Sequence, residues 1–106
     1  MTCQDVSFEH GRCRIEVESR SDVDIPMFAA RILVVDGDEP VLRELTFADG
    51  RRVEIHGQTE TLALNSAVTY LEGRLGARAG PEFECDATAH LRYGPPLEVD
   101  EFRLSP

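Results

Sequence analysis

The chain has 106 residues, which is enough for one domain and too few for two. Hydrophobic residues make up 42% and charged residues 29% of the chain, a balance that suits a folded domain and not a disordered one. Twenty acidic residues against eleven basic ones give a net charge of −9, which disfavours direct binding to nucleic acid. We therefore expect a single domain over 1–106, with a core over 5–76 and an acidic C-terminal segment over 77–106.

The N-terminal sequence and the cysteines bear on the setting of the protein. Residues 1–5 carry neither a basic region nor an apolar stretch, so no signal peptide is expected, and the longest apolar run, 32–35, is too short to span a membrane. The three cysteines, Cys3, Cys13 and Cys85, form no CxxC pair, and their odd number argues against a disulfide framework or a zinc knuckle. We expect reduced thiols in a cytoplasm, with Cys13 as a small core residue.

The first two predicted strands form a hairpin. Val6 and Phe8 alternate with polar residues, and the alternation resumes after His10 and Gly11. This period of two gives each strand one apolar and one charged face. A two-residue turn at His10 and Gly11 would pair Val6 with Ile15 and Phe8 with Cys13, so that the apolar faces coincide.

Three further strands are expected between residues 28 and 57. Residues 28–35 (FAARILVV) are almost wholly apolar, which predicts a central strand covered on both faces. Residues 41–47 and 51–57 form the next hairpin. A three-residue loop over 48–50 pairs Leu45 with Val53 and keeps their apolar side chains on one face, and it requires Gly50 in the left-handed conformation.

A helix follows the last of these strands. Thr59 is the predicted N-cap, Glu60 lies in the first turn where the helix dipole favours an anion, and Gly76 ends the helix. Five apolar residues recur at helical spacing, namely Leu64, Ala67, Val68, Leu71 and Leu75. This stripe must cover one face of the sheet, so Val68 and Leu71 should share one core with Ile15 and Ile32.

The sequence of the C-terminal tail, 77–106, allows two interpretations. Residues 82–93 (EFECDATAHLRY) alternate throughout, which favours a strand, whereas Asp86 could instead cap a short helix over 87–93. Residues 97–104 alternate in part and suit an edge strand or a docked arm. The predicted fold is α+β: an antiparallel meander of about five strands, one long helix packed on one face, and one or two strands added by the tail.

The sequence holds no catalytic motif. It lacks GxSxG, HExxH and a glycine-rich phosphate loop, and His10, His56 and His90 have no metal-ligand partner at helical spacing. We therefore expect no enzymatic activity, no cofactor and no metal. The candidate surface for a protein partner is a set of acidic residues in the tail, namely Glu82, Glu84, Asp86, Glu98, Asp100 and Glu101.

The junction between the last long strand and the helix carries one resemblance. A glycine is followed two residues later by a threonine cap and then by alanines and leucines, at Gly57, Thr59, Ala63, Leu64, Ala67 and Leu71. This segment, 57–71, resembles the turn into the helix of HicB-like antitoxin domains and of other small bacterial strand-strand-strand-helix domains. The proline-rich segment usual before that glycine is replaced by residues 51–56, so the resemblance implies the fold class and not an antitoxin role.

Two functions are expected from different classes. The first is a non-enzymatic protein-binding or regulatory module, which needs an exposed apolar patch or a free strand edge. The second is an acidic nucleic-acid mimic that occupies a basic nucleic-acid-binding partner, which needs the acidic residues on one continuous face. A small enzyme or metal-binding protein ranks last.

The sheet edges also predict a homodimer. An open meander has two edges with unpaired backbone groups, and natural edges are blunted by Lys, Pro or a covering segment. The chain has no Lys, its predicted strands have no interior Pro, and the tail is expected to cover one edge. A symmetric dimer would cover the other edge, as well as the second face of the strand over 28–35.

Overall fold

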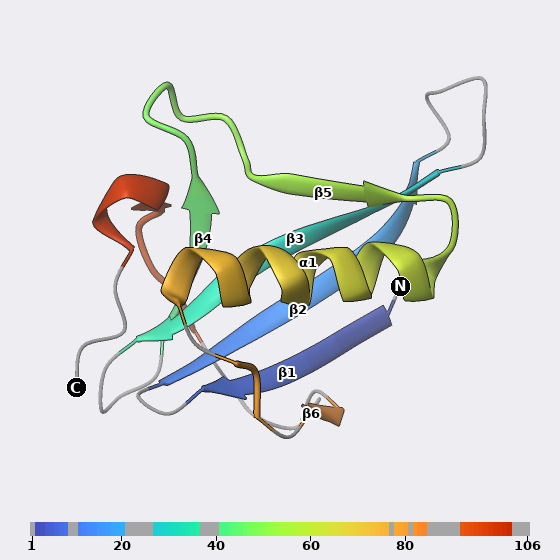
Figure 1. Ribbon diagram of the computed structural model, residues 1–106. Coiled ribbons are helices and arrows are strands. Elements are labelled where there is room, and N and C mark those ends of the chain that lie inside the picture. Colours follow the sequence, from blue (N-terminus) through green and yellow to red (C-terminus); the bar gives the residue numbers. More distant parts are fainter. Residues whose placement is uncertain are drawn as a thin grey trace.

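The computed structural model describes residues 2–8, 11–20, 27–36, 41–76, 78–80, 82–84 and 92–102. In these ranges one α-helix lies across one face of an eight-stranded, mostly antiparallel sheet (Figure 1). This arrangement confirms the α+β class. It also confirms that the single long helix packs on one face of the sheet.

The first four strands form an antiparallel meander: β1 (Thr2–Phe8), β2 (Gly11–Arg20), β3 (Met27–Asp36) and β4 (Val41–Thr46). β3 is central, as predicted for residues 28–35. It pairs with β2 along one edge, and its other edge is shared by β4, beside 33–36, and by β5 (Glu54–Gly57), beside 28–31. The fifth strand therefore returns to β3 and does not extend the meander beyond β4.

The hairpin between β1 and β2 has a different register from the predicted one. Phe8 pairs with Gly11 and Val6 with Cys13, so the predicted pairing of Val6 with Ile15 is wrong by two residues. A shift by two residues leaves every side chain on its own face of the sheet, and the hydrophobic alternation therefore could not exclude it. Residues 9 and 10 lie outside the described ranges.

The turn after β4 has the predicted form. The N–H of Val53 donates to the carbonyl of Leu45 over 3.1 Å, and the N–H of Phe47 donates to the carbonyl of Arg51 over 2.8 Å. Gly50 has a φ of 87°, in the left-handed region that this loop requires. The pairing of Leu45 with Val53 is thus confirmed, together with the shared face of their side chains.

The helix α1 (Glu60–Leu75) begins and ends where the sequence predicts. The hydroxyl of Thr59 accepts a hydrogen bond from the N–H of Leu62 over 3.1 Å, and Gly76 ends the helix with a φ of 65°. Neither α1 nor any other helix in the described ranges has the length and apolar character that a membrane crossing requires. The face of α1 toward the sheet buries Ala63, Ala67 and Leu71.

Gly57 lets the chain turn tightly from β5 into α1. A Cβ atom at this position would overlap the backbone nitrogen of Ala63 and lie 2.9 Å from its Cα. Only glycine fits such a close approach between strand and helix backbones without moving one of them. The glycine that opens the 57–71 resemblance thus has a steric cause in this chain.

One hydrophobic core joins the helix to the sheet. Ile15, Ile32 and Leu71 are fully buried in it, and Val68 packs against it while partly exposed. This confirms the core predicted from the helix stripe. Phe102, near the C-terminal end of the described chain, is also buried in this core at 2% exposure, so the tail docks onto it.

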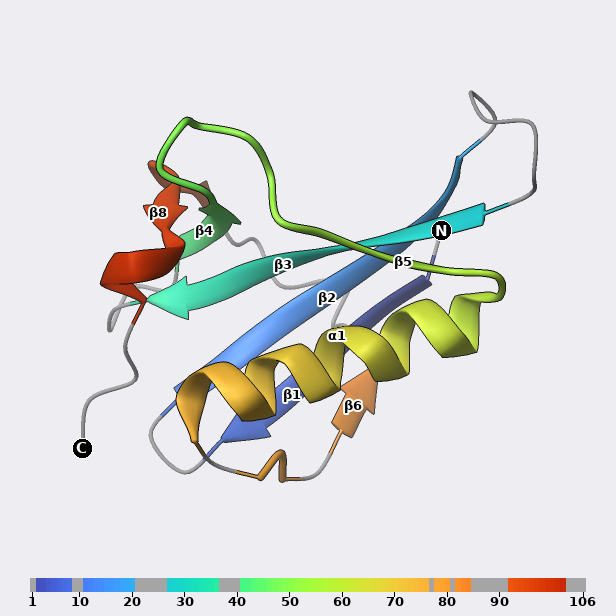
Figure 2. The same ribbon diagram turned by 45° about the horizontal axis from the view of Figure 1, so that its top comes forward.

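The tail adds three short strands and a 3₁₀ turn at two edges of the sheet (Figure 2). β6 (Glu82–Glu84) pairs with β1, whereas β7 (Arg92–Tyr93) and β8 (Leu97–Glu98) pair with β4 and precede the turn η1 (Val99–Glu101). One continuous strand over 82–93 is therefore wrong, because its two ends pair at opposite edges. The alternative helix over 87–93 is wrong at 92–93, and residues 85–91 lie outside the described ranges.

The cysteines differ from one another. Cys13 is a free, buried thiol, as predicted, but Cys3 is disulfide-bonded, which corrects the expectation of reduced thiols throughout. Gln4 pairs with Glu84, the residue before Cys85 in the sequence, while Cys85 itself lies outside the described ranges. A disulfide is typical of oxidising compartments, so the cytoplasmic expectation loses the support of reduced thiols.

Candidate binding surface

The sheet face opposite α1 carries charged side chains in place of a second apolar layer. In the strand register, Leu33 lies between Arg14 on β2 and Glu44 on β4, and Arg14 lies opposite Asp5 on β1. Leu33 is fully buried on this face, as the prediction of a strand covered on both faces requires. Long charged side chains can shield such a residue with their aliphatic stems while their charged groups pair above it.

The most buried part of this face is the ion pair between Asp5 and Arg14. The Nε of Arg14 donates to Oδ1 of Asp5 over 2.8 Å, and Nη2 donates to Oδ2 over 3.2 Å. Asp5 is 4% exposed and Arg14 8%. The hydrogen bond to Asp5 raises the pKa of Arg14 above its ordinary value, although burial works against it. This two-point pair joins β1 to β2.

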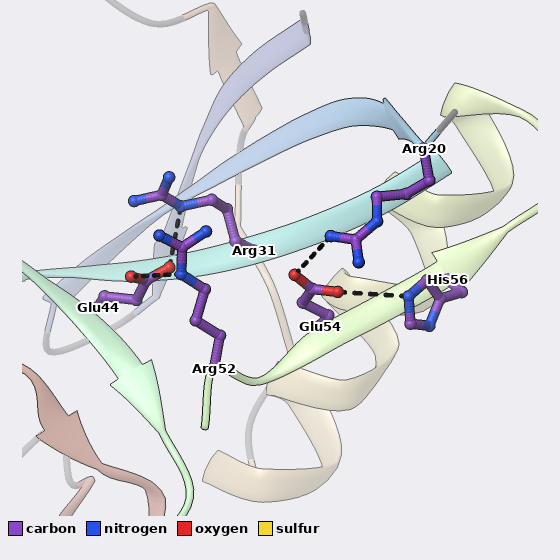
Figure 3. A network of polar contacts seen from close by, with 6 residues as sticks. All are labelled: Arg20, Arg31, Glu44, Arg52, Glu54 and His56. Atoms are coloured by element: carbon purple, nitrogen blue, oxygen red, sulfur yellow. Dashed lines mark hydrogen bonds and ion pairs between the residues drawn. The ribbon is translucent and has the colours of Figure 1, made fainter. Parts of the chain in front are cut away.

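A chain of ion pairs continues across the next strands (Figure 3). The Nε of Arg31 lies 3.6 Å from Glu16 and 2.9 Å from Glu44, and the Nε of Arg52 lies 3.3 Å from Glu44. The contact between Arg31 and Glu44 has the geometry of an ion pair and not of a hydrogen bond. These contacts link β2, β3 and β4 to the segment that leads into β5.

A second, more exposed cluster lies beside β5. Nη1 of Arg20 donates to Oε1 of Glu54 over 3.0 Å, and Oε2 of Glu54 lies 3.4 Å from Nε2 of His56 (Figure 3). The side chains of Arg20, His56 and Arg52 are 37%, 46% and 53% exposed. The charged face is therefore buried near β1 and open to solvent near β5.

β5 has an outer edge with no backbone partner in the part of the chain that the structure describes. It pairs with β3 along its inner edge (Figure 1), while β6 pairs with β1, and β7 and β8 pair with β4. The tail thus reaches both β1 and β4, and not one edge as predicted. Residues 51–57 (RRVEIHG) contain neither Lys nor Pro, two of the residues that protect natural edges from pairing.

Exposed apolar side chains flank segment 51–57 in the sequence. Phe47 is 40% exposed, and its N–H donates to the carbonyl of Arg51, so it lies beside the start of segment 51–57. The guanidinium of Arg51 lies 5.5 Å from the centre of the Phe47 ring. Leu62 is 50% exposed in the first turn of α1, next to Gly57 at the end of β5. Phe47 thus lies before segment 51–57, on the side toward β4, and Leu62 follows β5, so that exposed apolar surface flanks the segment in sequence at either end.

The acidic candidate residues do not come together. Glu82 and Glu84 lie in β6 beside β1, whereas Glu98, Asp100 and Glu101 lie in β8 and η1 beside β4 (Figure 2). Asp100 forms a 3.2 Å ion pair with Arg74 of α1. Asp86 lies outside the described ranges. The described members of the set thus lie at opposite edges and do not form one continuous face.

Two other places were candidates for chemistry. Among the described residues, no group of three His, Cys, Asp or Glu side chains is placed to hold a metal ion, and His10 and His90 lie outside those ranges. An open groove of about 660 Å³ lies at the C-terminal end of α1, lined by Thr69, Glu72, Gly73, Gly76 and Arg78. Glu72 there accepts a hydrogen bond from the N–H of Ala79 over 2.9 Å.

Two features of this surface were not predicted from the sequence: the charged face and the outer edge of β5. The sequence does indicate a charged face, because polar residues such as Arg14, Glu16 and Arg31 alternate with core residues along the predicted strands. Which acid meets which base depends on the cross-strand register, which the alternation leaves open. The free edge depends on β5 pairing with β3, a choice of neighbour that local patterns do not specify.

Comparison with protein-family models, curated proteins and solved structures finds no match to this chain. The resemblance to HicB-like domains over 57–71 therefore rests on those residues alone.

Proposed function

We propose that this chain is a non-enzymatic protein-binding module that binds an extended segment at the outer edge of β5. The observation that carries the proposal is this outer edge of β5, which has no backbone partner among the described residues and is flanked in sequence by the exposed Phe47 and Leu62. An added strand gains main-chain hydrogen bonds from such an edge, and its side chains meet those of the edge strand on both faces.

The side chains of segment 52–56 define the kind of strand that fits. Arg52, Glu54 and His56 lie on the charged face, and Val53 and Ile55 lie on the face toward α1. A partner strand with charges on one face and apolar residues on the other would match both sides. The partly exposed Arg52 and His56 offer the contacts that select one partner over another.

The alternative function, an acidic nucleic-acid mimic, has weaker support. It needs the acidic residues on one continuous face, and the described ones lie at opposite edges of the sheet. The larger charged face is a mixture of acids and bases that neutralise one another. Such a face does not imitate the uniform charge of a phosphate backbone.

Two variants with the same change of charge test the proposal. Arg52→Glu alters the charged side of the β5 edge, and Arg78→Glu alters an exposed site by the groove at the end of α1. A tagged chain from its own host should retain its protein partner with Arg78→Glu and lose it with Arg52→Glu. Hydrogen exchange should show that the partner slows exchange of the amides over 53–57. Equal retention by both variants, or unchanged exchange over 53–57, would contradict the proposal.

A further inference from the structure

We propose that the strand bound at this edge is β5 of a second copy of the chain, so that two sheets join into one around a two-fold axis. This inference rests on the proposed function of the β5 edge and names its partner. The two charged faces would then lie on the same side of the joined sheet. Both α1 helices would lie on the other side.

Symmetry leaves few registers for such a pairing. Antiparallel partners point to the same face, so the two-fold axis must pass at one residue of the strand and not between two residues. Within β5 an axis at Glu54 sets two glutamates against each other, and an axis at His56 sets two histidines against each other. An axis at Ile55 sets Glu54 of each copy opposite His56 of the other.

The pairing of a carboxylate with an imidazole selects the register centred on Ile55. Glu54 and His56 already lie on one face, since their side chains approach to 3.4 Å within the chain. In the dimer each Glu54 would also face a His56 across the new edge, so two complementary contacts form together. An imidazole can pair with the carboxylate directly across from it, whereas two carboxylates placed across from one another repel and destabilise an antiparallel pair.

The surfaces beyond β5 extend the contact. β5 has four residues, so its backbone pairing alone would bury little area. The register ends at Gly57, because the chain turns there into α1. The first turn of α1, which follows at once, therefore lies beside the new interface with Leu62 exposed. Covering this apolar side chain would add to the contact made by the backbone pairing.

The test is the mass in solution of the full chain and of three variants. Sedimentation equilibrium at micromolar concentration and physiological salt should give twice 11.8 kDa for the unaltered chain. His56→Glu places two acids opposite two acids and should weaken the dimer about tenfold. Combining Glu54→His with His56→Glu again places each carboxylate opposite an imidazole and should recover the affinity. Asn65→Glu, on the exposed side of α1, adds the same negative charge elsewhere and should change nothing.

The outcomes separate this inference from the proposed function. A mass of 11.8 kDa at all concentrations overturns the dimer, as does a dimer that His56→Glu leaves intact. The unaltered chain could instead bind a protein other than itself. If that protein slows exchange of the amides over 53–57 and Arg52→Glu abolishes its binding, the proposed function holds without the dimer. Should the variants fold poorly, the unaltered chain decides by itself: exchange over 53–57 must slow as concentration rises through the dissociation constant.

Discussion

On the side of the sheet that α1 covers, Ile15, Ile32 and Leu71 meet in a dry apolar core; on the other side, the same strands pair Asp5 with Arg14 and pass ion pairs from strand to strand. Neighbouring residues show the contrast most clearly. Burial raises the pKa of the Cys13 thiol to about 12 and keeps it neutral, while the hydrogen bond to Asp5 raises the pKa of Arg14 and keeps it charged. One strand thus serves two opposite environments.

The contrast has a direct meaning for stability. The stabilisation by apolar contacts grows with the apolar area removed from water. Truncating a buried apolar side chain loses its transfer free energy and leaves a cavity that costs more. Removing one partner of a buried ion pair is strongly destabilising, whereas replacing both partners by apolar residues of similar volume often is not. An ion pair exposed to solvent contributes little to stability. The two faces should therefore respond differently to single substitutions, to paired substitutions and to salt.

Leu71→Ala should have the largest effect, because Leu71 is fully buried between α1 and the sheet. We expect a loss of about 4 kcal/mol in the free energy of unfolding, within the range of about 2–5 kcal/mol for buried leucines. Urea denaturation measures it, and Leu62→Ala, at an exposed site on the same helix, should cost less than about 0.5 kcal/mol. Equal losses for the two variants would mean that α1 does not pack through this face.

Asp5→Ala should cost about 3 kcal/mol, because it leaves the buried guanidinium of Arg14 without the acid that pairs with it. Urea denaturation again gives the loss. The combined change of Asp5→Leu with Arg14→Met should recover most of it, since an apolar pair of similar volume needs no compensating charge. A double variant as unstable as the single one would show that this face needs the ion pair itself.

The parts of this fold that could be predicted have local signals. The Thr59 cap, the Gly76 stop and the turn at Gly50 each follow from residues close in the sequence, and all three are confirmed. The predicted register of β1 with β2 was wrong, because an alternating pattern is unchanged when one strand shifts by two residues. The return of β5 to β3 was not predicted, because such a pattern does not specify which strand lies beside which.

The candidate site was harder to predict for the same reason. Acidic residues such as Glu84 and Glu98 are close in the sequence but lie at opposite edges, since β6 and β8 pair with different strands. The charged face needs partners from five separate segments, namely β1, β2, β3, β4 and residues 52–56, and in the sequence its members were visible only as the polar residues of each alternating strand. Long-range pairing, and not residue type, determines both results.

The thiol of Cys13 tests the apolar face through pH. Its pKa is raised to about 12 from 9.0, so the unfolded chain releases this proton before the folded chain does. The contribution of the neutral thiol to the free energy of unfolding should be complete below pH 9. It should fall by about 1.4 kcal/mol for each pH unit between 9 and 12. Urea denaturation at pH 8 and pH 10 measures the slope, with Cys13→Ala as the control that lacks it. Equal slopes, or rapid alkylation of Cys13 in the folded chain, would mean that water reaches this face.

Arg52→Met should have the smallest effect. The Arg52 guanidinium lies 3.3 Å from Glu44, but its side chain is 53% exposed, so solvent screens the pair. We expect a loss of about 0.5 kcal/mol or less at physiological salt, and none at about 1 M salt, where the Debye length falls to about 3 Å. Urea denaturation at both salt concentrations measures the difference, and Asp5→Ala, tested in parallel, should keep most of its cost at high salt because its pair is buried. A loss at Arg52 as large as the one at Asp5 would mean that the ion pairs act as one unit across the sheet. A small loss would instead allow Arg52 to be changed without unfolding the chain, so that a binding defect in Arg52→Glu reports on the β5 edge.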